Sequence, residues 1–251
     1  MKMKTFCIKR NINYQEVMAN GNLFEKFYEI DNPCNDKLIT IPDGSIDIQC
    51  LWRNNKLKVL IVGSFREGGA SLLTEYDKCF GGRLIRGVVP SCFKGFMEDI
   101  ISNRIPIESF LRIPEMEDLI SFDLPLEQKA DCMLSLLENA MITDENIITK
   151  HIINTIEKEH GNVIIGDMVE TLGYSHRYTN RVFKSNVGLS IKNYANIVRL
   201  QESLRYIRLQ RDDDIYSKLG YYDQAHFIHD FKKFSSFTPN AMKKIQDINF
   251  V

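Results

Sequence analysis

The 251-residue sequence predicts an α+β protein of two domains: a β-rich N-terminal domain with flanking helices, and an all-α C-terminal domain in which a long helix joins two helix-turn-helix units. Three observations support this prediction. Apolar residues alternate with a period of two in part of the first half, they recur at helical spacing from residue 126 onward, and a helix, Gly-Tyr, helix pattern occurs twice. The boundary is expected near residue 145, which gives domains of residues 1–144 and 145–251.

Composition and charge restrict the class of protein. Apolar residues make up 44% of the chain and charged residues 26%, which is typical of a protein that folds around a core. No apolar run is long enough for a transmembrane helix and the N-terminus lacks the apolar segment of a secretory signal, so we expect a cytoplasmic protein without a membrane partner.

The charge is divided unevenly along the chain. Residues 150–251 carry 15 basic and 11 acidic side chains, whereas residues 1–149 carry 17 basic and 22 acidic ones. A net positive C-terminal part is typical of a domain that binds a polyanion, and ordinary scatter of charges is the alternative.

The six cysteines are spaced too widely for a metal site. No two of them are closer than 13 residues, and the sequence contains neither a CxxC motif nor a Cys/His cluster. We therefore expect reduced thiols, several of them packed as small hydrophobic side chains, with no metal and no cofactor. A redox-sensing or ligand-contacting thiol is the alternative.

The N-terminal part reads as a series of strands. Alternating apolar residues predict strands over residues 45–52 and 56–62, and residues 81–90 are expected to form a further strand that Pro90 closes. Four aromatic residues are expected in the core or, alternatively, around an apolar ligand pocket: Trp52, Phe65, Phe93 and Phe96. Turn residues predict breaks at 42–44, 54–55, 68–69 and 81–82.

One amphipathic helix is expected after Pro125. Its apolar residues form a single stripe, which must be covered by its own domain or by the same stripe of a second copy, so a homodimer is left open. The next helix is expected to begin at an N-cap residue, Thr143 or Asp144. The stripe consists of Leu126, Ala130, Met133, Leu134, Leu137 and Met141.

Everything after residue 147 is expected to be helical, and one pattern occurs twice. In the first copy a short helix is followed by a turn at Gly173 and by a second helix with Ser175 as its N-cap. A long helix over residues 191–210 leads to the second copy, whose turn lies at Gly220, 47 residues after Gly173. A Phe-Lys pair follows in both copies, and its two Phe residues, Phe183 and Phe231, are 48 residues apart, which indicates a duplicated helix-turn-helix unit.

The two copies read DMVETLGYSHRYTNRVFKSNVGLSIKNYANIVRLQESLRYI and DIYSKLGYYDQAHFIHDFKKFSSFTP. With their Gly-aromatic turns, Phe-Lys pairs and final Thr-Pro, residues 150–245 resemble the DNA-binding domain of the AraC/XylS family of bacterial transcription regulators. The resemblance implies a sequence-specific DNA-binding regulator, usually an activator that contacts RNA polymerase. Residues 41–52 and 82–97 more loosely resemble sensory domains of some members, although Ser45 stands where those domains carry Cys.

The first motif offers side chains that read DNA. A recognition helix presents its N-terminal half to base edges in the major groove, where Arg bonds guanine and Asn bonds adenine. Helical spacing places Arg177, Asn180 and Arg181 opposite the core-facing Val182 and Phe183, and the resemblance implies that Gln224, Ala225 and His229 match the family's base-contacting positions. The predicted DNA-contacting residues are Ser175, His176, Arg177, Asn180, Arg181 and Lys184 in the first motif, and Gln224, Ala225, His229 and Lys232 in the second. Lys192 and Arg199 are further candidates for phosphate contacts, and an ordinary solvated basic face is the structural alternative.

The second motif is expected to recognise DNA bases less well than the first. Ala225 can contact only a thymine methyl group, Asp230 repels phosphate, and three aspartates at 212–214 precede the motif. It is therefore expected to bind DNA weakly or to serve as scaffold. The two recognition helices are expected to enter successive major grooves, roughly 34 Å apart.

The expected function is a DNA-binding transcription regulator with double-stranded DNA and RNA polymerase as partners and a small-molecule effector in the N-terminal domain. The alternative is a ligand-independent regulator whose N-terminal domain only oligomerises. A fusion of an enzyme with a regulator, as in some DNA-alkylation repair proteins, needs clustered Cys ligands. The cysteine spacing, the absence of His before residue 151 and the lack of GxSxG, P-loop and HExxH motifs argue against an enzyme.

Overall fold

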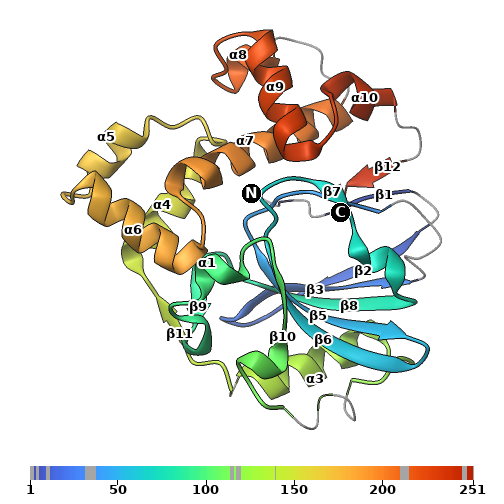
Figure 1. Cartoon of the computed structure of the whole chain (residues 1–251). Helices are drawn as coiled ribbons and strands as arrows, with labels where there is room; N and C mark the ends of the chain where they lie inside the picture. The colour runs from blue at the N-terminus through green and yellow to red at the C-terminus, as the bar shows by residue number, and fades with distance from the viewer. Residues whose placement is uncertain are drawn as a thin grey trace.

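The structure is a computed structural model, and it describes residues 3, 6–9, 12–31, 38–113, 116, 120–138, 140–209, 215–244 and 248–250. A β-rich N-terminal part is followed by a helical C-terminal part, as the predicted fold class requires. In Figure 1 the six-stranded sheet occupies the lower right, and the C-terminal helices lie to its left and above it.

A six-stranded antiparallel sheet forms the centre of the N-terminal part, with strand order β10-β6-β5-β8-β3-β2. A tight hairpin joins β5 to β6 at Asn54 and Asn55, whose φ angles of 50° and 60° suit the turn that the sequence predicts there. Both faces of the sheet are buried along β5. The strands are β2 Asn13–Met18, β3 Phe24–Asp31, β5 Ile46–Arg53, β6 Lys56–Gly63, β8 Lys78–Leu84 and β10 Arg104–Pro106.

Two smaller sheets complete the β structure. A four-stranded sheet has the order β12-β1-β4-β7, and β11 pairs with β9. β12 comes from the C-terminal end of the chain, so the expectation that everything after residue 147 is helical is wrong there. The elements are β1 Phe6–Lys9, β4 Ile39–Thr40, β7 Gly69–Ala70, β9 Val88–Pro90, β11 Thr143–Glu145, β12 Ile248–Phe250, η2 Leu72–Glu75, η3 Ser91–Phe93, η4 Ile107–Ser109 and α1 Met97–Ile100.

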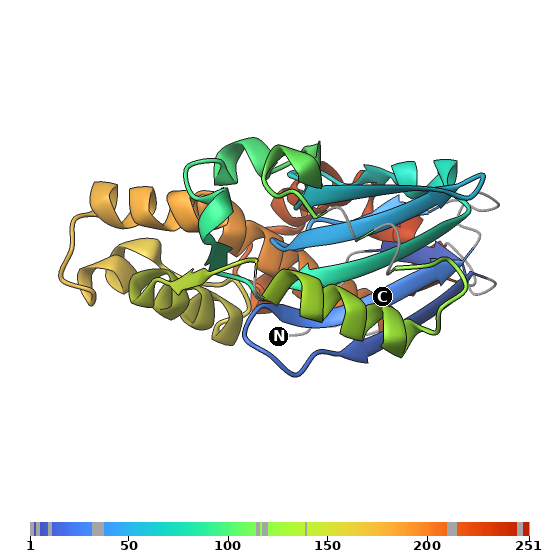
Figure 2. The same ribbon diagram turned by 90° about the horizontal axis from the view of Figure 1, so that it is seen from below.

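Helix α3 (Leu126–Glu138) covers the face of the six-stranded sheet that points away from the four-stranded sheet (Figures 1 and 2). Its apolar stripe is buried in the main core of the N-terminal part, where Met133 and Leu137 are fully buried and Leu134 is partly buried. The stripe is therefore covered by its own domain. This is the first of the two alternatives, and the stripe does not need a second copy to cover it.

Two expectations in the N-terminal part are wrong. Gly81 and Gly82 lie inside β8 instead of marking a break, because the Tyr28 ring and the Phe24 ring occupy the space that their side chains would need. Residues 81–90 belong to two strands, β8 and β9, since the chain turns at Gly87, which has a φ of 80°.

The N-cap of helix α4 lies two or three residues later than expected. Residues 143–145 form β11, so neither Thr143 nor Asp144 is the N-cap. The N-cap is Asn146, whose Oδ1 accepts a hydrogen bond from the Thr149 amide at 3.0 Å. The domain boundary near residue 145 stays a prediction.

The C-terminal part contains two helical groups that meet along α7. The first half of α7 belongs to the core of the first group and the second half, with Leu200, Leu204 and Ile207, belongs to the core of the second. Gly161 ends the segment after α4, as expected, with a φ of 79°. The helices are α4 Ile147–Lys158, α5 Ile165–Glu170, α6 His176–Val187, α7 Ile191–Arg208, α8 Ile215–Lys218, α9 Gln224–Ser235 and α10 Pro239–Lys244.

The N-terminal part packs directly against α7. Ile41 belongs to the same core cluster as Leu200 and Leu204. The Gln201 amide donates a hydrogen bond to the carbonyl oxygen of Pro42 at 2.7 Å. The loop that precedes β5 therefore touches the helix that joins the two helical groups.

A buried ion pair makes a second connection between the two parts. Arg86 Nε lies 2.9 Å from Glu157 Oε1 on α4, and the Tyr194 hydroxyl on α7 donates to the same oxygen at 2.8 Å. Burial raises the pKa of Glu157, but the Arg86 charge and hydrogen bonds that include the one from Tyr194 together hold that pKa below its ordinary value. The carboxylate therefore stays charged at neutral pH and joins the turn between β8 and β9 to α4 and α7.

Four cysteines are free thiols in the described part of the chain: Cys50, Cys79, Cys92 and Cys132. Burial raises the pKa of the Cys50, Cys79 and Cys92 thiols, so they are poor nucleophiles at neutral pH. Cys34 and the side chain of Cys7 lie outside the described residues. Among the helices that the structure describes, none is both long and apolar enough to cross a membrane.

Candidate nucleic-acid interface

The first helix-turn-helix unit consists of α5, a turn and α6. The turn lies at Gly173, whose φ of 71° is a backbone conformation that favours glycine. Ser175 is the N-cap of α6, as predicted, and its Oγ accepts a hydrogen bond from the Tyr178 amide at 3.3 Å. One face of α6 is buried through Thr179, Phe183 and Val187. The opposite face is left to solvent.

Four of the predicted DNA-contacting residues lie together on this open face. Ser175, His176, Arg177 and Arg181 are exposed, and the two arginines lie one helical turn apart. The first turn of α6 contains no acidic residue, so the positive end of the helix dipole is not neutralised there. This end of α6 is a cationic surface that can bind phosphates and the edges of guanine bases.

Two further predicted residues are engaged within the protein. Asn180 is partly buried, and its Oδ1 accepts a hydrogen bond from the Ile191 amide at 3.1 Å, which positions the start of α7. Lys184 forms an ion pair with Glu98 of α1. Both residues have a structural partner in the free protein, and their contact with DNA stays a prediction.

Tyr178 is a candidate that the sequence reasoning missed. Its exposed ring packs against Tyr174 with 5.2 Å between ring centroids, and the Arg181 guanidinium lies 5.6 Å from the Tyr178 ring centroid. A cation over an aromatic face is held in place by the ring quadrupole. The signal was present in the sequence, because an aromatic residue three positions before an arginine lies beside it on a helix.

The second unit repeats this arrangement with α8, a turn at Gly220 and α9. Asp223 is the N-cap of α9, and its Oδ1 accepts a hydrogen bond from the His226 amide at 2.7 Å. The buried face carries Phe227, Phe231 and Phe234, as expected. The predicted contact residues Gln224, Ala225, His229 and Lys232 are all exposed. The aspartates at 212–214 lie outside the described residues.

Asp230 places a negative charge beside the exposed residues of α9. Its Oδ2 lies 3.5 Å from His226 Nε2, and its Oδ1 lies 3.4 Å from His229 Nδ1. The carboxylate is thus held between two imidazole rings on the surface that faces outward. This geometry agrees with the expectation that α9 attracts phosphate less than α6 does.

The Arg199 side chain, a candidate for a phosphate contact, is instead engaged within the protein. The side chain is partly buried on α7, where Nη2 donates to the carbonyl oxygen of Gly161 at 3.0 Å and the guanidinium lies 5.0 Å from the Tyr221 ring centroid. It therefore connects the end of α4 to the second unit. Lys192 remains exposed.

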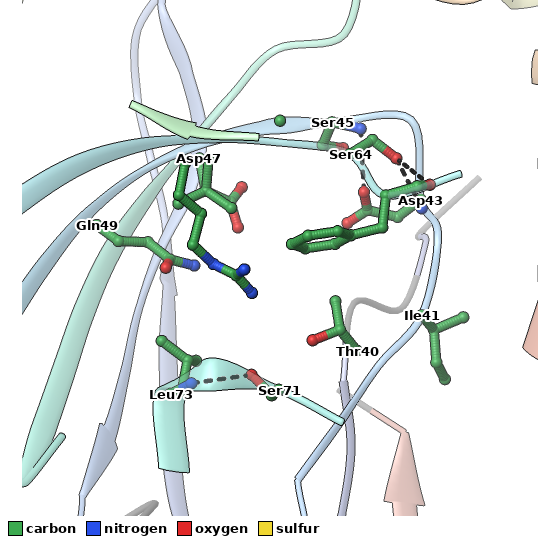
Figure 3. Close-up of a pocket in the computed structure, with 13 residues that line it drawn as sticks. Thr40, Ile41, Asp43, Ser45, Asp47, Gln49, Ser64, Ser71 and Leu73 are labelled. Atoms are coloured by element: carbon green, nitrogen blue, oxygen red, sulfur yellow. Dashed lines mark hydrogen bonds between the residues drawn. The ribbon is translucent and has the colours of Figure 1, made fainter. Parts of the chain in front are cut away.

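A polar pocket lies on the inner face of the six-stranded sheet (Figure 3). Beside it, buried Arg83 is bound by two carboxylates: Nη2 lies 2.9 Å from Asp43 Oδ2 and Nε lies 3.0 Å from Asp47 Oδ1. Burial alone would lower the pKa of Arg83, but the two carboxylates raise it well above its ordinary value. The pocket has a volume of about 20 Å³, which is room for roughly one water molecule.

Of the four aromatic candidates, Trp52 and Phe93 are buried in the main core. Phe96 is half exposed, and Phe65 lines the polar pocket beside Arg104. The four residues therefore do not surround one apolar pocket.

Comparison with known proteins identifies the C-terminal helices. Residues 168–245 match the model of a family described as a helix-turn-helix domain. This segment is an AraC-type helix-turn-helix domain. It contains both units described above, from α5 to α10.

The matched relatives are bacterial regulatory proteins. The transcriptional regulatory protein HptR of Staphylococcus aureus is 30% identical over 79 residues, which is 31% of this chain and 31% of HptR. An uncharacterized response regulatory protein of Staphylococcus epidermidis is 29% identical over 86 residues, or 34% of each chain. The similarity thus spans about a third of the length of these relatives. A crystal structure of ToxT from Vibrio cholerae is 12% identical, with 96% of this chain and 98% of that chain covered and a TM-score of 0.42.

Proposed function

We propose that this protein is a sequence-specific DNA-binding transcription regulator. The observation that carries the proposal is the exposed, cationic N-terminal end of α6, where Arg177 and Arg181 lie one turn apart in a helix-turn-helix domain. Such a helix end presents its side chains to the major groove while its buried face holds it on the protein. The matched family is one of binding domains, which favours a regulator over an enzyme.

The two units contribute unequally in this proposal. The helix α6 is the principal reader, because it offers two arginines and lacks an acidic side chain in its first turn. The helix α9 offers Gln224 and His229 but carries Asp230 beside them. Four of the remaining predicted residues, Ser175, His176, Lys184 and Lys232, are proposed to contact the DNA backbone.

The finer parts of the proposal concern regulation. Activation through contact with RNA polymerase rests on the family resemblance alone. A small-molecule effector bound between the sheets would need the pocket beside Arg83 to open, since its volume of about 20 Å³ is too small for an organic ligand. This observation favours the second candidate, a regulator that works without a ligand in that pocket and whose N-terminal part positions or assembles the DNA-binding units.

The experiment that tests the proposal compares arginine variants at fixed salt. Arg177→Ala and Arg181→Ala should each weaken binding to the preferred duplex by about 1–3 kcal/mol and change binding to unrelated DNA much less. The matched control is Arg53→Ala, which removes an exposed arginine from β5. Unchanged specific binding in both α6 variants, measured by fluorescence anisotropy, contradicts the assignment of α6 as reader.

A further inference from the structure

A loop of the N-terminal part docks on the second recognition helix. The Gly68 amide donates a hydrogen bond to the carbonyl oxygen of Phe234 at 2.6 Å, and the Ser236 hydroxyl donates to the carbonyl oxygen of Gly68. Ser236 is the C-cap of α9. A side chain at Gly68 would place its Cβ only 2.9 Å from the Phe234 oxygen, so this close approach requires glycine.

The neighbouring residue, Glu67, places a carboxylate beside the outward face of α9. Glu67 is exposed and borders an open hollow whose other lining residues all come from the second unit. They include the predicted contact residues Ala225, His229 and Lys232 at i, i+4 and i+7, and also Ile228, Lys233 and Ser236. A DNA phosphate that approached these lysines would meet the Glu67 carboxylate at the same place.

The second unit is held on another side by the end of the chain. After α10 the chain returns to the N-terminal part, where β12 pairs antiparallel with β1 in the four-stranded sheet. In Figure 1 the group of α8, α9 and α10 lies above β7 and β12. The second unit is therefore anchored through both the Gly68 loop and β12.

The first unit meets the N-terminal part differently. The contact involves the C-terminal end of α6, where Lys184 pairs with Glu98 and Gly188 lies close to Met97. The arginines at the N-terminal end of α6 stay exposed. Lys184 and Lys232 occupy equivalent places in the two units, directly after Phe183 and Phe231. An acidic residue of the N-terminal part lies near each of these lysines.

We propose that the loop over residues 64–68, between β6 and β7, is an internal competitor of DNA at the second unit. While Gly68 is docked, Glu67 stands in the path of the DNA backbone, and the protein binds DNA through α6 alone. Release of the loop frees α9 to enter the next major groove. Two hydrogen bonds and one exposed carboxylate form a small contact, which a duplex held by the first unit can displace. The inference rests on the proposed function, because it requires that the chain binds duplex DNA.

Two adjacent glycines provide a matched test in the full-length protein. A Cβ at Gly68 meets the backbone of α9, whereas a Cβ at Gly69 has no atom within 4 Å. Gly68→Val should therefore displace the loop and raise affinity for a duplex selected by the wild-type protein about five- to tenfold. Gly69→Val should stay within about twofold of wild type. Hydroxyl-radical footprints should lengthen by about 10 base pairs for Gly68→Val only.

A second variant tests the inference independently, in case Gly68→Val does not fold. Ser236 has a φ of 64°, so Ser236→Gly relieves the backbone while it removes the hydroxyl that bonds Gly68. It should raise affinity and lengthen the footprint in the same direction as Gly68→Val. Gln224→Ala should weaken binding several-fold in the Gly68→Val background and much less in the wild-type background.

The outcomes separate this inference from the proposed function. Specific binding by wild type with a footprint that already covers both grooves, unchanged in Gly68→Val and Ser236→Gly, overturns the competitor role and leaves the proposed function intact. The same is true if Gly69→Val raises affinity as much as Gly68→Val. If no form of the protein selects or binds a preferred duplex, the proposed function fails and the inference fails with it.

Discussion

Arg181 and Tyr178 form an ordered pair on the exposed side of α6. A long arginine side chain loses conformational entropy when it binds DNA, and a ring that already holds the guanidinium reduces that cost. The guanidinium lies 5.6 Å from the Tyr178 ring centroid. This is within the roughly 6 Å over which an aromatic face attracts a cation. We therefore expect Tyr178 to act as a positioning residue through Arg181.

Tyr178→Ala should weaken specific binding by about 0.5–1 kcal/mol, and Tyr178→Phe should retain it, because the phenyl ring preserves the cation–π contact. In a double-mutant cycle, the Tyr178→Ala effect should vanish once Arg181 is replaced by alanine. Anisotropy titrations of the four proteins on one duplex measure the coupling. Equal losses from Tyr178→Ala with and without Arg181 would show that the ring acts independently.

Substitutions in the second unit should have smaller effects than those in the first. Gln224→Ala and His229→Ala should weaken specific binding less than Arg177→Ala. The reason is that the Asp230 carboxylate lies beside the predicted contact residues of α9 and repels phosphate. Asp230→Asn should raise affinity modestly, within about tenfold, by removing a negative charge near the DNA backbone. Titrations at two salt concentrations measure this ranking. If the α9 changes prove more damaging than Arg177→Ala, α9 is the principal reader.

At the scale of elements, α3 forms one side of the hydrophobic core of the N-terminal part. Leu137 is fully buried between α3 and the six-stranded sheet, whereas Ser135 on the same helix is exposed. A carboxylate at position 137 would be desolvated without a partner, and the chain would unfold to hydrate it.

Leu137→Glu should therefore lower the free energy of unfolding by about 3 kcal/mol or more, and Ser135→Glu should leave it within about 0.5 kcal/mol. Urea denaturation followed by circular dichroism gives both values. A folded Leu137→Glu protein with wild-type stability that has lost a dimer contact, seen by sedimentation velocity, would instead place the stripe at an interface between copies.

The predictability of each element from sequence depended on how local its causes are. The α6 helix, its Ser175 cap and the Asn54-Asn55 hairpin were predicted because short-range backbone rules determine them. Gly81 and Gly82 were taken for a break because the rings that fill their space come from β3, more than 50 residues earlier. The partners of Asn180 and Lys184 and the docking of Gly68 on α9 are tertiary contacts between segments far apart in the chain or on different elements, and no local pattern encodes them.

At the scale of the whole molecule, the Arg86–Glu157–Tyr194 group joins the N-terminal part to both α4 and α7. Burial raises the pKa of Glu157, but the Arg86 charge and hydrogen bonds that include the one from Tyr194 together hold it below its ordinary value of 4.5. A lowered carboxylate pKa means that the ion pair stabilises the folded state fully above pH 4.5. This contribution is lost as the pH falls through the still lower value in the folded protein.

Glu157→Gln should thus lower the free energy of unfolding by about 1.5–3 kcal/mol at neutral pH. The difference from wild type should shrink as the pH falls below 4.5. The exposed neighbour Glu159 provides the control, since Glu159→Gln should have little effect at either pH. Urea denaturation at pH 7 and in the acid range, about pH 4, measures the difference. If Glu157→Gln lowers the free energy of unfolding by the same amount at both pH values, packing and not charge stabilises the contact between the N-terminal part and the two helices.

The central claim is that the full-length protein recognises a particular DNA sequence through its helix-turn-helix units. Selection from a random duplex pool with the purified protein, followed by titration of the enriched duplex and a scrambled duplex at one fixed salt concentration, tests it most directly. We expect enrichment of a single motif, bound at least about a thousandfold more tightly than the scrambled duplex, with most of that preference lost in Arg177→Ala. A pool that stays random through repeated rounds, or equal affinity for the two duplexes, would contradict it.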